Sequence, residues 1–134
     1  MSFPRKRESI WEVKMAAKKI LICDDEESIR ESLKLVLGDY YDLVLVDGGE
    51  QALHTLGNTK DIGLMLLDIK MPRVHGLDIL NEIKSKYPHI KIIMVTGYRS
   101  VETAAEATRL GACGYIIKPF KSEEILETVK RNLA

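Results

Sequence analysis

Five short hydrophobic runs, each followed by a segment with helical spacing, organise the chain from Lys18 onward. The runs are continuous and rich in Ile, Leu and Val, as is typical of strands buried on both faces of a parallel sheet. They are centred on residues 20–23, 43–46, 62–67, 92–95 and 115–117. Five strand–helix units in a row predict an α/β fold, with a doubly wound, five-stranded parallel sheet and helices on both of its faces.

The segments after these runs carry apolar residues three and four positions apart, which is the period of an amphipathic helix. The five apolar stripes are Ile29, Leu33, Val36 and Leu37; Ala52, Leu53 and Leu56; Leu77, Leu80 and Ile83; Val101, Ala104, Ala105 and Thr108; and Ile125, Leu126, Val129 and Leu133. The stripe over 101–108 is mostly alanine and threonine, so it buries less apolar surface than the leucine-rich stripes. We therefore predict that this helix is the least firmly docked element and is suited to move when a nearby site changes state.

Length and composition narrow the class of protein. The chain has 134 residues, the usual size of one domain, and 46% of them are hydrophobic and 30% charged. Its net charge is zero, so no overall field draws it to nucleic acid or to an acidic membrane. No apolar run approaches the roughly 20 residues that span a bilayer, and residues 1–14 lack the apolar core of a secretion signal. We expect a cytoplasmic protein with no direct nucleic-acid or membrane partner.

Residues 1–17 differ from the rest of the chain because they show no clear hydrophobic period. Their one basic stretch has only three residues, too few to favour nucleic-acid binding. We interpret 1–17 as an N-terminal extension, disordered or non-native, and 18–134 as the domain. Cys23 and Cys113 lie in or beside apolar runs without metal-ligand spacing, and we expect both to be buried, reduced thiols.

Residues able to handle a phosphoryl group follow four of the runs. They are Asp24 and Asp25 after the first run, Asp68 after the third, Thr96 after the fourth and Lys118 after the fifth. In the flavodoxin-like strand order 2-1-3-4-5, the third strand lies beside the first, and the carboxyl ends of all strands share one edge of the sheet. Three carboxylates, a hydroxyl and an ammonium group are therefore predicted to converge there.

This set of side chains suits phosphoryl transfer to a carboxylate. A carboxylate can attack a phosphoryl donor and become an acyl phosphate. Three adjacent carboxylates repel one another, and Mg²⁺, or alternatively Mn²⁺, relieves the repulsion because it prefers oxygen ligands. The Lys118 ammonium and the Thr96 hydroxyl would then meet the incoming phosphoryl oxygens. Each residue alone has an equally good structural explanation, in a helix start, a turn or a solvated surface; their joint position at neighbouring strand ends favours a site.

The chain resembles the receiver domain of bacterial two-component response regulators over about residues 18–134. The motifs that carry the resemblance are Asp24-Asp25, the stretch Leu67-Asp68-Ile69-Lys70-Met71-Pro72 followed by Gly76, Thr96-Gly97, and Lys118-Pro119-Phe120 with Tyr115 just upstream. Several motifs in the right order over a whole domain make this resemblance specific. It implies a phosphorylation-controlled switch and not a turnover enzyme, either stand-alone, like the chemotaxis regulators, or cut from a longer transcription regulator.

The resemblance also implies roles for individual residues. Asp68 would accept a phosphoryl group from a histidine kinase or a phosphotransfer histidine. Mg²⁺ would be held by Asp25, Asp68 and the backbone carbonyl of Lys70, with Asp24 acting largely through water. Thr96 would move toward the phosphoryl group while Tyr115 turns inward, and the Lys118–Pro119 bond would be cis. These movements would alter the face formed by the helix over 101–110, the strand over 115–117 and the last helix.

The sequence departs from the commonest family pattern at a few positions. Val74 and His75 precede Gly76 where methionine and an acid are frequent, which affects nothing catalytic. Lys70 and Tyr98 lie two residues after Asp68 and Thr96, and in similar domains these positions flank the path of the water that hydrolyses the acyl phosphate. A long cation and a bulky ring there predict a long-lived phosphoryl state.

Partners follow from the resemblance, and two other classes remain as alternatives. We expect a sensor histidine kinase or phosphotransfer protein upstream, and downstream either a separate output protein or an output domain beyond this sequence. A phosphorylation-linked dimer is compatible with the same face. A flavin-binding protein would need a phosphate-binding loop where this chain has acidic residues. A Mg²⁺-dependent aspartyl-nucleophile phosphatase or phosphotransferase would need a substrate cap, and the short loops predict no pocket for an organic substrate.

Overall fold

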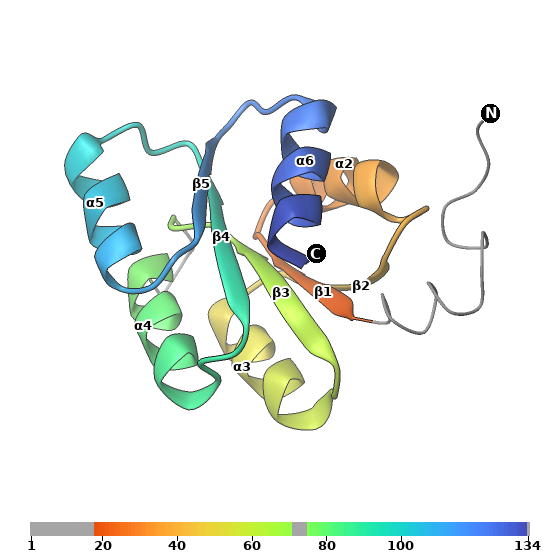
Figure 1. Cartoon of the computed structure of the whole chain (residues 1–134), viewed down its shortest axis with the longest axis horizontal. Helices are drawn as coiled ribbons and strands as arrows, with labels where there is room; N and C mark the ends of the chain where they lie inside the picture. Colours follow the sequence, from red (N-terminus) through yellow and green to blue (C-terminus); the bar gives the residue numbers. More distant parts are fainter. Residues whose placement is uncertain (1–17, 71–74, 134) are drawn as a thin grey trace.

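The computed structural model describes residues 18–70 and 75–133, so the N-terminal extension predicted over 1–17 and the departure at Val74 lie outside the described residues. Strands and helices alternate along the described chain (Figure 1). In chain order they are β1 (Lys19–Cys23), α2 (Glu27–Leu37), β2 (Asp42–Val46), α3 (Gly49–Asn58), β3 (Ile62–Leu67), α4 (Gly76–Lys86), β4 (Lys91–Thr96), α5 (Val101–Arg109), β5 (Gly114–Ile117) and α6 (Ser122–Leu133).

The five strands form one parallel sheet in the order β2-β1-β3-β4-β5, which confirms the predicted doubly wound topology. Each strand begins and ends within one residue of its hydrophobic run. The register aligns the strands at their carboxyl ends: Cys23 pairs with both Val46 and Leu67, and Leu67 pairs with Met94. The residues that follow these strands therefore emerge at the same level.

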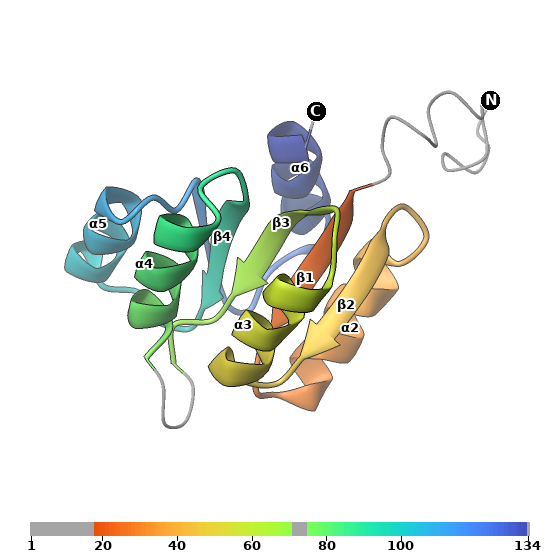
Figure 2. The same ribbon diagram turned by 90° about the horizontal axis from the view of Figure 1, so that it is seen from below.

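Two apolar layers cover the sheet. Helices α3, α4 and α5 pack on one face and α2 and α6 on the other (Figure 2). Neighbouring strand residues alternate between the layers, with Leu21 and Met65 under the first set of helices and Ile20 and Leu64 under the second. All six residues of β3 are buried because this central strand has neighbours on both sides and helices on both faces.

The predicted apolar stripe of α5 is wrong. Val101 is 80% exposed, and the residue that α5 buries fully is Ala107, with Leu110 packed beside it. The Ser100 hydroxyl accepts a hydrogen bond from the Thr103 backbone N–H (3.2 Å), which fixes the helix start and leaves Val101 in a solvent-facing first turn. This orientation also brings the partly buried Leu110, the residue after α5, against the core, and the predicted stripe did not contain it. The inward face still offers mostly small side chains.

The two cysteines differ in their surroundings. Cys23 is buried at the end of β1, as predicted, whereas Cys113 is exposed and that prediction is wrong. Cys113 precedes β5 at the amino end of the sheet, where helices do not cover it, and its thiol lies 3.4 Å from the Ile92 carbonyl oxygen that can accept its hydrogen bond. Among the described residues, no helix combines the length and apolar character needed to cross a membrane.

Candidate functional site at the carboxyl edge of the sheet

Backbone hydrogen bonds fix the residues that follow β1 and β3. The Asp24 N–H donates to the Val46 carbonyl (3.2 Å), and the Asp68 N–H donates to the Cys23 carbonyl (3.2 Å). Each bond continues the parallel ladder one step past the end of a strand. The two aspartates are thereby held on adjacent strands at the switch point of the sheet, where the order of the strands reverses.

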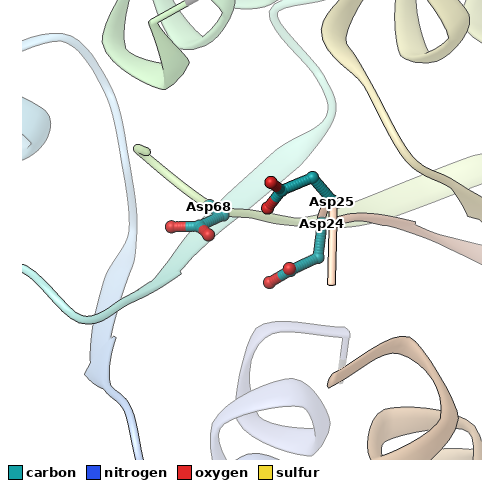
Figure 3. Close-up of side chains that lie close together, drawn as sticks. All are labelled: Asp24, Asp25 and Asp68. Carbon is teal, nitrogen blue, oxygen red and sulfur yellow. The ribbon is translucent and has the colours of Figure 1, made fainter. Parts of the chain in front are cut away.

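Three carboxylates gather at this point. Asp24, Asp25 and Asp68 each offer an oxygen, and these oxygens lie within 4.8 Å of one another (Figure 3). Asp24 and Asp68 are buried and Asp25 is exposed, so the cluster opens to solvent on one side. This donor set fits Mg²⁺, which binds carboxylate oxygens and keeps part of its water shell.

Lys118 supplies the opposite charge. Its ammonium group donates to Asp24 Oδ2 at 2.8 Å and to Asp68 Oδ2 at 3.0 Å, and a third carboxylate, from Glu26, lies at 3.3 Å. Burial lowers the pKa of the Lys118 ammonium, but its hydrogen bonds and attraction to Asp24 and Asp68 outweigh burial and raise the pKa above its ordinary value. Lys118 therefore stays charged throughout the physiological range. The Lys118–Pro119 bond is cis, as the resemblance implies.

Asp24 is the most constrained of the carboxylates. Its Oδ1 accepts the Glu26 backbone N–H (2.9 Å), and the Arg30 guanidinium donates to its backbone carbonyl (2.8 Å). Burial raises the pKa of Asp24, while the hydrogen bond and charge of Lys118 act in the opposite direction and offset only part of the shift. Without a cation, the ionised form of Asp24 is therefore less favourable in the fold than in water.

A chain of hydrogen bonds links β4 to β5 through the backbone of Tyr98. The buried Thr96 hydroxyl accepts the Tyr98 N–H (3.3 Å), and the Tyr115 hydroxyl donates to the Tyr98 carbonyl (3.0 Å). Burial raises the pKa of Tyr115, and the charge of Asp68 adds to the effect. The Tyr115 ring packs against the apolar layer under α3, α4 and α5. Tyr115 thus already lies inward, in contact with the loop that follows Thr96.

The Asp68 side chain and backbone are held by residues that follow it. Its Oδ1 accepts the Lys70 backbone N–H (3.2 Å), and the Gly76 N–H donates to the Ile69 carbonyl (2.7 Å). Gly76 approaches this segment so closely that a Cβ there would lie 2.2 Å from the Asp68 carbonyl oxygen. The glycine at the start of α4 therefore sets the position of the Asp68 backbone.

The site lies in an open pocket of about 590 Å³. The residues that line it are Asp25, Glu26, Asp68, Lys70, Thr96, Gly97, Tyr98 and Lys118. Five of these eight residues carry a formal charge, which suits small anions and cations better than an apolar organic substrate. The lining includes every residue predicted for the site except Asp24, which is buried, and Tyr115, whose hydroxyl donates to the Tyr98 carbonyl.

Glu26 is the functional neighbour that the sequence analysis did not identify. The sequence analysis assigned Asp24 and Asp25 to the site, but nothing in the acidic run from Asp24 to Glu27 distinguishes one of its two glutamates from the other. The structure separates them, because Glu26 contacts Lys118 and Glu27 begins α2. The contact spans 92 positions of sequence, so only the fold brings it about.

The chain belongs to the response regulator receiver domain family, whose family description matches residues 20–130. It is 36% identical over 118 residues to the response regulator protein FleR of Pseudomonas aeruginosa, covering 87% of this chain and 24% of FleR. It is also 36% identical over 119 residues to the regulatory protein AtoC of Escherichia coli, covering 88% of this chain and 26% of AtoC. The chain thus spans about a quarter of the length of these two relatives.

Solved structures agree with this assignment. A CheY-like response regulator receiver domain protein from Methanospirillum hungatei superposes with a TM-score of 0.82 at 35% identity, over 87% of this chain and 93% of the other. The receiver domain of NtrX from Brucella abortus superposes with a TM-score of 0.80 at 33% identity, over 85% and 97%. The family is one of phosphorylation-dependent signalling switches, so the phosphatase alternative is not favoured.

Proposed function

We propose that this domain receives a phosphoryl group on Asp68 from a histidine kinase or a phosphotransfer histidine. The observation that supports the proposal is the Asp68 carboxylate, held at the carboxyl edge of the sheet beside the Lys118 ammonium and two further carboxylates. In the transfer, an Asp68 oxygen forms a bond to phosphorus as the bond to the donor nitrogen breaks, and the histidine leaves with that electron pair. The domain processes no other substrate.

Neighbouring side chains would stabilise the charge of the phosphoryl group. The Lys118 ammonium and the Thr96 hydroxyl would donate to its oxygens. A Mg²⁺ or Mn²⁺ ion would be held by Asp25, Asp68 and the Lys70 backbone carbonyl, with Asp24 acting largely through water. The cation would supply positive charge that offsets both the carboxylates and the phosphoryl oxygens.

The response to phosphorylation would travel through Tyr98. The Thr96 hydroxyl accepts the Tyr98 N–H and can still donate its own proton to a phosphoryl oxygen, so a movement of Thr96 toward the phosphoryl group would carry Tyr98 with it. Tyr98 in turn accepts the hydrogen bond from Tyr115. A shift of this loop would therefore alter the α5–β5–α6 face, where α5 is anchored mainly by small side chains. That face would bind a separate output protein, an output domain of a longer regulator or a second copy of the chain, in the cytoplasm where the kinase acts.

Lys70 and Tyr98 would set the lifetime of the phosphoryl group. Both line the same pocket as Asp68, which supports the proposal that their side chains flank the approach of a hydrolytic water. We expect Lys70→Asn combined with Tyr98→Glu to speed dephosphorylation, measured as loss of phosphorylated protein by intact mass after the donor is removed. An unchanged rate would contradict this role.

The direct test is incubation with Mg²⁺ and acetyl phosphate, followed by intact mass spectrometry. The wild type should gain the mass of one phosphoryl group and Asp68→Asn should not. Asp78→Asn removes an exposed carboxylate from α4 and serves as the matched control, which should be phosphorylated like the wild type. Modification of Asp68→Asn to the wild-type extent would refute the proposal.

A further inference from the structure

All three hydrogens of the Lys118 ammonium are already used. An ammonium group has three donors. They face Asp24 Oδ2 (2.8 Å), Asp68 Oδ2 (3.0 Å) and Glu26 Oε1 (3.3 Å). A phosphoryl oxygen can therefore bind Lys118 only if one of these three carboxylates gives up its contact.

The three contacts differ in how easily they can be released. The side chains of Asp24 and Asp68 are only 3% and 5% exposed, so losing Lys118 before the transfer, while Asp68 is still a carboxylate, would leave either one a buried charge without its cation. The Glu26 side chain is 59% exposed and makes the longest of the three contacts. Water can solvate it as soon as it leaves Lys118, so Glu26 is the group that yields at least cost.

We propose that, in the resting domain, the Glu26 carboxylate occupies the place on Lys118 that the phosphoryl group later takes, and that Glu26 thereby slows phosphorylation of Asp68 by small anionic donors. This inference rests on the proposed function of Asp68. It assigns Glu26 as a positioning residue, because it acts through Lys118 and not on the reacting atoms. Phosphorylation then requires an exchange of one anion for another on the same ammonium group.

The charge balance of the site points the same way. Asp24, Asp25, Glu26 and Asp68 carry four negative charges, against the positive charges of Lys118 and of Lys70, which also lines the pocket. A bound divalent cation would balance the three aspartates together with Lys118, and Glu26 adds a negative charge that these two cations do not balance. An anionic donor that enters the pocket meets this charge at its rim, because Glu26 is one of the lining residues.

The test compares Glu26→Gln with Glu27→Gln. The first substitution removes the negative charge that Glu26 places beside Lys118, while keeping the side-chain shape. The second removes the same charge one residue further on, from an exposed glutamate that makes none of the Lys118 contacts among the described residues.

The quantity measured is the rate constant for phosphorylation by acetyl phosphate at saturating Mg²⁺. In this reaction the Asp68 oxygen bonds to phosphorus while the bond from phosphorus to the acetate oxygen breaks, and acetate leaves with the electron pair.

Glu26→Gln should be phosphorylated roughly two- to fivefold faster than the wild type, since exposed ion pairs of this kind are weak. Glu27→Gln should stay near the wild-type rate. At about 1 M salt, where the screening length falls to about 3 Å, the advantage of Glu26→Gln should shrink, which a purely structural effect of the substitution would not do. A rate for Glu26→Gln equal to or below that of Glu27→Gln would overturn the proposal.

A second measurement follows the side chain directly. In a crystal structure of the domain with Mg²⁺ and beryllium fluoride, a mimic of the phosphoryl group, a fluorine should replace Glu26 beside Lys118. A Glu26–Lys118 contact that persists at hydrogen-bonding distance in that structure would also overturn the proposal. If wild-type Asp68 takes up no phosphoryl group from any donor, the proposed function itself fails; if the wild type is phosphorylated and the two variants behave alike, only the role of Glu26 fails.

Discussion

Replacing Gly76 by alanine tests how α4 positions the phosphoacceptor strand end. A Cβ at this position would lie 2.2 Å from the Asp68 carbonyl oxygen and 2.5 Å from the Ile69 Cα. Both neighbours are backbone atoms, so relief requires the start of α4 or the segment after β3 to move. Such overpacking costs about 1–3 kcal/mol. Loss of the 2.7 Å hydrogen bond from the Gly76 N–H to the Ile69 carbonyl adds about 1 kcal/mol.

The expected total loss in the free energy of unfolding is about 2–4 kcal/mol, which for a domain of this size corresponds to a fall of about 8–16 °C in the midpoint of thermal unfolding. Circular dichroism melts and urea titrations measure it, and phosphorylation of Asp68 by acetyl phosphate should slow because its backbone is displaced.

The matched control is Gly57→Ala. Gly57 lies inside α3, and a Cβ there would meet only the Tyr87 hydroxyl at an ordinary 3.8 Å. Alanine is the better helix former, so this variant should gain up to about 1 kcal/mol in stability. The same chemical change is thus expected to act with opposite sign at two helical glycines. An unfolding midpoint of Gly76→Ala equal to that of the wild type would refute the reasoning from close backbone approach.

Three further predictions concern charge, switching and local stability. Burial raises the pKa of the Asp24 carboxyl above its ordinary value of 3.8, so the metal-free fold should lose stability as the pH rises above 3.8 and the carboxyl ionises. Asp24→Asn should abolish this loss and stabilise the metal-free protein near neutral pH. The same variant should bind Mg²⁺ more weakly, and thermal melts with and without the ion measure both effects. Tyr115→Phe removes the 3.0 Å hydrogen bond to the Tyr98 carbonyl and should cost about 0.5–1.5 kcal/mol, with a greater mobility of the following loop in NMR relaxation. Amide hydrogens of α5, which fully buries only Ala107, should exchange faster than those of α2, which buries Leu33 and Leu37; equal protection would count against weak docking of α5.

Hydrophobic periodicity was sufficient to predict the sheet. A strand buried on both faces, such as β3, reads as an unbroken apolar run, and such runs are bounded sharply by polar residues. The strand order was predicted from the flavodoxin-like order of doubly wound sheets, which places the first and third strands side by side. The carboxylate cluster followed, since parallel strands in register bring their carboxyl ends to one edge.

Periodicity was less informative where side chains are small. In α5 a stripe of alanine and threonine can be drawn along more than one face, and the buried face was decided by the capping of Ser100 and the packing of Leu110. Cys113 shows the same limit, because its apolar neighbours in sequence do not enclose it in space. The spacing of apolar residues indicates which of them could be buried on one helix face. The packing of the helix on the sheet decides which face is actually buried.

The sequence by itself determined the α/β architecture, the alignment of the strand ends and the residue types that meet there, because these depend on short-range patterns repeated along the chain. The tertiary structure alone decided how the charges are paired. Lys118 could have faced any of several acidic side chains, and the loops after β1 and β5 bring it to Glu26 as well as to Asp24 and Asp68. Contacts between residues so far apart in the chain depend on loop geometry and burial, which no local pattern encodes.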